Sequence, residues 1–230
     1  MTRNELLVHS VPTMTHGRVL VAEARAAAAR GVIVGFHGYG ESAATHLERL
    51  QAIPGAASWT LVSAQALHRF YDRRTRQVVA CWMTHEDRED AIADNIGYVT
   101  AALEGVPHDP SRPIVFAGFS QGVAMAYRAA CRGPRRAAGI ISVGGDVPPE
   151  LLQEPDVAFP RVLMIRGRAD EWYAQQKFAD DTAALRARGV ELESLLVEGG
   201  HEWHQPVIDA AARFIEDVGG RPAEGRRQKA

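Results

Sequence analysis

The sequence has little of what marks several large classes of protein. It contains two cysteines in 230 residues, Cys81 and Cys131, too few and too widely spaced for a disulfide framework or a zinc knuckle. Its formal net charge of −2 gives no electrostatic reason to expect a nucleic-acid partner. No apolar run approaches the about 20 residues that span a bilayer, and the first residues lack the plan of a signal peptide. These absences predict a soluble cytoplasmic protein without integral membrane association.

The composition is that of a globular protein, with 46% hydrophobic and 23% charged residues. A chain of this length can bury a substantial core as one domain without disulfides or metals. We expect a single domain over residues 1–219 that has no room for a large cap. Residues 220–230 are expected to form a mobile basic tail, because no apolar side chain there is large enough to anchor it.

The most informative stretch covers residues 113–127, which combine an apolar strand, a tight turn and a helix that begins at once. Its centre, Gly118-Phe119-Ser120-Gln121-Gly122, is a G-x-S-x-G nucleophile elbow, in which a strained turn holds the serine hydroxyl clear of the sheet. Glycine on both sides lets strand and helix approach closely. The motif predicts Ser120 as a nucleophile.

The rest of the chain alternates strands with helices. Residues 31–36 form an apolar, β-branched run between glycines, as in a central strand covered on both faces. The alternation predicts an α/β protein with a mostly parallel, doubly wound sheet, and a hairpin of residues 6–8 with 18–22 is expected at its edge. The other expected strands are 59–63, 113–117, 138–143, 161–166 and 190–197, and the expected helices are 42–52, 86–103, one after Ser120, 171–188 and 205–218.

A serine nucleophile needs a histidine base and a carboxylate that orients the base, and α/β-hydrolases place them in the order Ser, acid, His. Asp170 follows the expected strand 161–166, and His201 follows the strand 190–197. Open α/β sheets assemble their sites at the carboxyl ends of strands. We therefore expect Ser120, Asp170 and His201 to converge on one rim of the sheet.

Two alternatives stay open at this stage. Asp146, after the preceding strand, could supply the carboxylate instead of Asp170. His204 could be taken for the base, but its place at the start of the last helix favours a surface or supporting role. The segment His201-Glu202-Trp203-His204 lacks the H-E-x-x-H spacing that puts two zinc ligands on one helix face, and we expect neither a metal nor a cofactor.

The oxyanion formed during acyl transfer needs two preorganised N–H donors. One is expected from the backbone of Gln121, which follows the nucleophile at the start of its helix. The other is expected from the backbone of Tyr39 in His37-Gly38-Tyr39-Gly40, where glycines allow a close approach. A glycine-rich turn without catalytic use is the alternative for this loop.

Four motifs at the ends of expected strands carry a family resemblance. They resemble the phospholipase/carboxylesterase family of small α/β-hydrolases, which includes bacterial carboxylesterases and acyl-protein thioesterases. The resemblance runs from about residue 31 to residue 215; it implies the α/β-hydrolase fold, the same triad and the same two oxyanion amides. The motifs are His37-Gly38-Tyr39-Gly40, Gly118-Phe119-Ser120-Gln121-Gly122, Gly167-Arg168-Ala169-Asp170 and Gly199-Gly200-His201.

The resemblance also implies where substrate binds. Members of the family have a tryptophan near the acyl site at the place of Trp82, beside Met83. Relatives commonly carry leucine where Tyr39 stands, and an apolar, proline-containing stretch where Trp172 and Tyr173 follow the aspartate. We expect Trp82, Met83, Trp172 and Tyr173 to line the substrate pocket, with ordinary packing as the alternative for each.

The sequence thus predicts a serine hydrolase that cleaves carboxylic esters, with thioesters as a further class, through an acyl-serine intermediate. Its partner would be a small-molecule ester or acyl substrate. An open site favours short-chain or surface-presented acyl groups. The alternatives are a lysophospholipase or protein-deacylating thioesterase, and a non-catalytic binding member of the fold.

Overall fold

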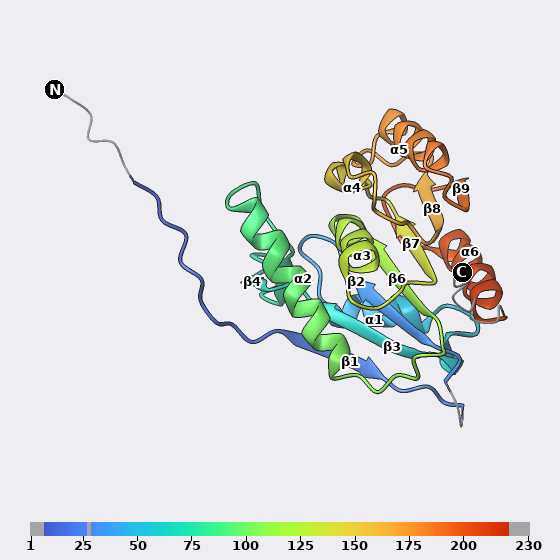
Figure 1. Cartoon of the computed structure of the whole chain (residues 1–230), viewed down its shortest axis with the longest axis horizontal. Helices are drawn as coiled ribbons and strands as arrows, with labels where there is room; N and C mark the ends of the chain where they lie inside the picture. Colours follow the sequence, from blue (N-terminus) through green and yellow to red (C-terminus); the bar gives the residue numbers. More distant parts are fainter. Residues whose placement is uncertain (1–6, 27–28, 221–230) are drawn as a thin grey trace, which may run out of the picture.

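A seven-stranded sheet forms the centre of the computed structural model, which describes residues 7–26 and 29–220. The strand order is β1-β3-β2-β6-β7-β8-β9 (Figure 1). Strand β1 is antiparallel to β3, and the other neighbouring pairs are parallel, which confirms the predicted α/β architecture. The strands are β1 (Arg18–Ala22), β2 (Val32–Phe36), β3 (Thr60–Gln65), β6 (Ile114–Phe119), β7 (Gly139–Val143), β8 (Arg161–Gly167) and β9 (Leu192–Val197).

Helices cover both faces of the sheet, which explains why its central strands have unbroken apolar sequences. Every residue of β2, β6 and β7 is buried. Val34 and Phe116 share one core cluster with residues of α2, α3 and α5, and Ile33 and Val115 share the other with residues of α1 and α6. The helices are α1 (Ala43–Gln51), α2 (Arg88–Glu104), α3 (Gln121–Arg132), α4 (Pro149–Gln153), α5 (Gln175–Ala187) and α6 (Gln205–Gly220).

The N-terminal edge of the sheet differs from the prediction. Leu7 and Val8 are exposed and form no strand, and residue 6 lies outside the described residues, so the expected hairpin with residues 18–22 is wrong. Strand β1 pairs with β3 instead, Val21 opposite Val62. This pairing satisfies the backbone groups along one side of β3, whereas a separate hairpin would leave them as an open sheet edge.

A small second sheet goes beyond the sequence prediction. Its strands, β4 (His68–Tyr71) and β5 (Val78–Cys81), are antiparallel. All of β4 is exposed, so it has no alternation of buried and polar residues that the sequence could reveal. A β-bridge between Glu41 and Ala80 ties β5 to the loop after β2, which places this hairpin beside the candidate site.

The start of α5 is later than predicted, at Gln175 instead of residue 171. The Asp170 carboxylate accepts the backbone N–H groups of Trp172 and Tyr173, each at 2.9 Å. These bonds hold the intervening residues in a turn, because an aspartate side chain competes with the helix for local N–H donors.

The C-terminal helix α6 ends at Gly220. Gly220, predicted as the first residue of the mobile tail, belongs to this helix, and residues 221–230 lie outside the described residues. Within the part of the chain that is described, no helix combines the length and apolarity needed to cross a bilayer.

Candidate active site

Ser120 occupies the turn between β6 and α3 in a strained backbone conformation, with φ 52° and ψ −123°. Non-glycine residues rarely adopt a positive φ. A Cβ at Gly118 would lie 2.5 Å from the carbonyl oxygen of Gly122, and one at Gly122 would lie 2.1 Å from that of Phe36. Strand and helix therefore approach so closely that only glycine fits, as in a nucleophile elbow.

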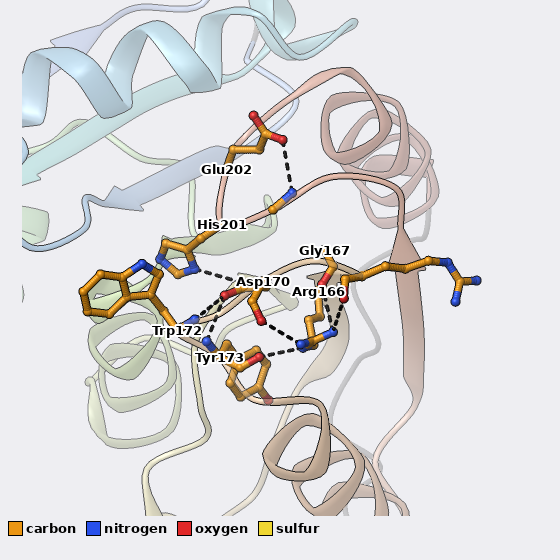
Figure 2. A network of polar contacts seen from close by, with 9 residues as sticks. Arg166, Gly167, Asp170, Trp172, Tyr173, His201 and Glu202 are labelled. Atoms are coloured by element: carbon orange, nitrogen blue, oxygen red, sulfur yellow. Dashed lines mark hydrogen bonds and ion pairs between the residues drawn. The ribbon is translucent and has the colours of Figure 1, made fainter.

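Asp170 and His201 form a hydrogen-bonded pair, with 2.8 Å between Oδ2 and Nδ1 (Figure 2). The other carboxylate oxygen of Asp170, Oδ1, accepts the N–H groups of Trp172 and Tyr173. A carboxylate that acts as an acceptor at both oxygens requires the proton of a neutral imidazole to be on Nδ1. The Nε2 atom of His201 is then left without a proton and can act as a base.

Buried Arg166, near the end of β8, holds the loop that carries Asp170 (Figure 2). Its guanidinium donates to the carbonyl oxygens of Tyr173 (2.6 Å), Asp170 (2.8 Å), Gly167 (2.9 Å) and Arg168 (3.3 Å). These bonds offset the cost of burying the charge. Arg166 was not among the predicted site residues, although a charge inside an otherwise apolar strand indicates that buried partners must exist.

Two consecutive glycines after β7 contact the histidine and the serine. A Cβ at Gly144 would lie 3.1 Å from both Nδ1 and Cε1 of His201, and one at Gly145 would lie 2.4 Å from the carbonyl oxygen of Ser120. The ring of Phe119, next to the serine, lies 5.0 Å from the imidazole ring. The structure thus places Ser120, Asp170 and His201 at the carboxyl ends of β6, β8 and β9, with Asp170 bonded to His201.

The alternative residues lie elsewhere. Asp146 is exposed and makes no hydrogen bond to a histidine among the described residues. His204 precedes α6, and its Nε2 contacts the carbonyl oxygen of Glu198. Across residues 7–26 and 29–220, no group of three His, Cys, Asp or Glu side chains is arranged to hold a metal ion.

Tyr39 and Gln121 carry backbone N–H groups with no hydrogen-bond acceptor in the described part of the chain. Gln121 is the first residue of α3, and Tyr39 lies in the loop after β2. The two segments are in contact, since a Cβ at Gly122 would lie 2.6 Å from the carbonyl oxygen of His37. Two unpaired donors beside a serine are what an oxyanion hole requires.

Buried His37 fixes the start of the loop that contains Tyr39. Its Nε2 accepts the backbone N–H of Ala66 at 3.1 Å, so the imidazole proton is on Nδ1, which donates to the carbonyl oxygen of Gly38 at 2.7 Å. Burial lowers the pKa of His37. The ring is therefore neutral at neutral pH and acts as a structural part of the loop.

Trp82 and Met83 support the site from inside. Trp82 has 0% of its surface exposed, and its indole N–H donates to the carbonyl oxygen of His37 at 2.8 Å. The side-chain amide of Gln121 accepts the N–H of Trp82 and donates to the carbonyl oxygen of Met83, both at 2.8 Å. Trp82 thus links the loop after β2 to the start of α3 and offers no surface to a substrate.

The other two predicted pocket residues have opposite environments. Trp172 is 84% exposed, and its ring lies 6.5 Å from that of His201. Tyr173 is buried, and its hydroxyl donates to Asp181 at 2.8 Å. Of this pair, Trp172 alone presents its ring at the surface.

Comparisons with known proteins identify the family and the fold. Residues 17–216 match the model of the family described as phospholipase/carboxylesterase, and no curated protein matches the chain significantly. The structure is similar to acyl-protein thioesterase 2 from Zea mays (19% identity, 89% of this chain and 100% of that chain, TM-score 0.70). It is also similar to esterase PE8 (22% identity, 89% of this chain and 100% of that chain, TM-score 0.72). A third similar structure is the Bacillus cereus carboxylesterase (14% identity, 88% of this chain and 94% of that chain, TM-score 0.67).

At these identities the structural likeness establishes the α/β-hydrolase fold alone. The family match is more specific, because it covers the chain from before β1 to within α6. The chain therefore belongs to the phospholipase/carboxylesterase family of esterase-type hydrolases.

Proposed function

We propose that the protein is a serine hydrolase that cleaves carboxylic esters through an acyl intermediate on Ser120. The observation that carries this proposal is the strained Ser120 turn beside a histidine whose Nδ1 is bonded to a buried aspartate. A serine hydroxyl is a poor nucleophile unless an adjacent base removes its proton. The unprotonated Nε2 of His201 is the proposed base, and Asp170 holds its ring in the required tautomer.

The proposed reaction has two halves. Ser120 Oγ attacks the ester carbonyl carbon while its proton moves to His201, and the resulting oxyanion accepts hydrogen bonds from the backbone N–H groups of Tyr39 and Gln121. The imidazolium, stabilised by Asp170, returns the proton to the departing alcohol as the C–O bond breaks. A water molecule then attacks the acyl-serine with the same base, releasing the acid and restoring the serine.

The same steps cleave a thioester, in which case the leaving group is a thiol. A protein-deacylating thioesterase or lysophospholipase is therefore the second candidate, and the similarity to the maize acyl-protein thioesterase 2 supports it. A non-catalytic binding member of the fold is the candidate from another class. The cytoplasmic location predicted from the sequence is part of the proposal.

A fluorophosphonate probe tests the catalytic role directly. We expect covalent labelling of the wild-type protein at Ser120 and none in Ser120→Ala, because the probe reacts with activated serines. A folded wild-type protein that stays unlabelled would refute the enzyme proposal and leave the binding role.

The substrate class is tested separately, with p-nitrophenyl esters from acetate to laurate beside acyl-thioesters of the same chain lengths. Faster turnover of short esters supports an esterase. A preference for long acyl chains or for thioesters would favour the second candidate.

A further inference from the structure

Glu41 and Arg49 form an ion pair beside the candidate site, and the proposed hydrolysis uses neither side chain. Arg49, in α1, donates through Nη1 to Oε2 and through Nη2 to Oε1 of Glu41, both at 2.7 Å. The two side chains are only 20% and 21% exposed. Two parallel bonds between partly buried groups fix the geometry far better than an ordinary surface pair does.

Glu41 closes the turn that contains Tyr39. Its Oε2 accepts the N–H of Gly38 at 2.8 Å, and its own N–H donates to the carbonyl oxygen of Gly38 at 3.3 Å. On the other side, Ala80 of β5 accepts the N–H of Gly40 at 3.0 Å and donates to the carbonyl oxygen of Glu41 at 2.9 Å. The peptide that carries the Tyr39 N–H is therefore held by bonds of its neighbours to Glu41 and Ala80, together with the bond from His37 to the Gly38 carbonyl oxygen.

Arg49 contacts the other half of the site. Its guanidinium carbon lies 4.5 Å from the centroid of the Phe119 ring, and Phe119 immediately precedes Ser120. The turn is also packed on this ring, since a Cβ at Gly38 would lie 3.2 Å from Phe119 Cδ1. The ion pair thus lies where the loop after β2 meets the nucleophile turn.

We propose that the Glu41–Arg49 pair is a positioning unit that aims the Tyr39 N–H at the oxyanion formed on Ser120. This inference rests on the proposed function. The pair touches neither the serine hydroxyl nor the imidazole, so it should affect kcat through transition-state stabilisation and leave KM and the pH midpoint of kcat/KM unchanged. A lysine at position 49 would keep the charge but lose the two-bond geometry.

The variants Glu41→Ala, Glu41→Gln, Arg49→Met and Arg49→Lys test the inference in a p-nitrophenyl ester assay. Glu41→Ala and Arg49→Met should lower kcat by about 10-fold to 100-fold, less than the loss of an oxyanion donor, which costs on the order of 100-fold to 1000-fold. Glu41→Gln keeps an acceptor for the Gly38 N–H and should recover part of the loss. Affinity for a boronic acid, which forms a tetrahedral adduct with an active serine, should fall in parallel with kcat/KM.

Arg161 supplies a matched control. It pairs with Asp217 at 3.0 Å and lies 4.9 Å from the Phe214 ring centroid, so its surroundings resemble those of Arg49. It stands at the start of β8, at the amino end of the strand and away from the site. Arg161→Met should lower stability but keep kcat near that of the wild type.

Several outcomes decide against the positioning role. Folded Glu41→Ala and Arg49→Met proteins that lose no more kcat than Arg161→Met would overturn it, and so would a loss seen only in KM or as a shifted pH midpoint. If Glu41→Ala does not fold, an unchanged kcat in Glu41→Gln and Arg49→Lys has the same meaning. Fluorophosphonate labelling of the wild type in parallel separates the two proposals, because a labelled, active wild type with unaffected variants refutes the positioning role alone.

Discussion

Replacement of Asp170 by asparagine should abolish most activity for a reason that can be worked out from the hydrogen bonds. Oδ1 accepts two backbone N–H groups, from Trp172 and Tyr173 at 2.9 Å each, and Oδ2 lies 2.8 Å from Nδ1 of His201. Asparagine offers one oxygen and one NH2 group. The oxygen should face the two backbone donors, because the reverse orientation leaves both unpaired, at about 1–3 kcal/mol for each buried group.

The NH2 group of asparagine then faces Nδ1 of His201, which must become an acceptor. The imidazole proton moves to Nε2, and in that tautomer the ring cannot take the proton of Ser120. A wrong tautomer in a serine triad costs about 10⁴-fold in kcat, which corresponds to about 5 kcal/mol of activation free energy. The fold should remain intact, because asparagine has the shape of aspartate.

The assay compares kcat for a p-nitrophenyl ester in wild type, Asp170→Asn and Asp146→Asn, together with the thermal unfolding midpoint of each protein. Asp146 is exposed and is the matched control. An Asp170→Asn protein that keeps more than about a tenth of the wild-type turnover would refute the proposed role of Asp170, given the expected loss of about 10⁴-fold. If Asp146→Asn suffers the large loss instead, Asp146 is the catalytic acid.

Three other perturbations have defined outcomes. Burial lowers the pKa of His46 from 6.5 to about 3, so the folded state binds fewer protons than the unfolded state between these pH values. Because of His46, the folded protein should lose about 1.4 kcal/mol of unfolding free energy for each unit of pH below about 6.5. Urea unfolding at pH 7 and pH 5 measures this loss, and His46→Gln should reduce it. Gly144→Ala would put a Cβ 3.1 Å from the His201 ring at a backbone φ of 63°. The value of kcat should fall by about 10-fold or more, because a small misplacement of a catalytic group is costly. An unchanged kcat in a folded variant would contradict the contact. Trp172→Ala removes an exposed ring beside His201. Measured on esters of increasing chain length, this variant should change KM more than kcat. A uniform effect on all esters would show that the ring does not contact the acyl chain.

The sequence predicted the central strands well because burial on both faces produces a local signal, an unbroken apolar run. It predicted the edge poorly. Residues 18–22 were correctly expected to be a strand, but their partner is β3, more than 35 positions later in the chain. Strand pairing depends on which edge is left open after the sheet assembles, and no local pattern records that. The strand β4 shows no alternation of buried and polar residues, because all of its residues are exposed.

The same contrast holds within the site. Ser120, Asp170 and His201 were predicted because each follows a recognisable strand, and parallel strands bring their carboxyl ends to one rim. The environment of a side chain is not a local property. Trp82 and Trp172 were predicted alike as pocket residues, yet one is fully buried and the other is 84% exposed, since their surroundings come from distant segments.

Two of the segments at the rim are held by a polar side chain that bonds to backbone groups. Arg166 binds the carbonyl oxygens around Asp170, and the Gln121 amide binds the backbone of the Trp82 segment. Such bonds can hold short loops in a reactive arrangement without a covering domain, because preorganised groups need no further ordering when substrate arrives. Side chains outside these bonds are then free to vary without disturbing the arrangement. Tyr39 and Trp172, both exposed at this rim, are therefore where we expect substrate preference to be altered by substitution while the catalytic geometry is kept.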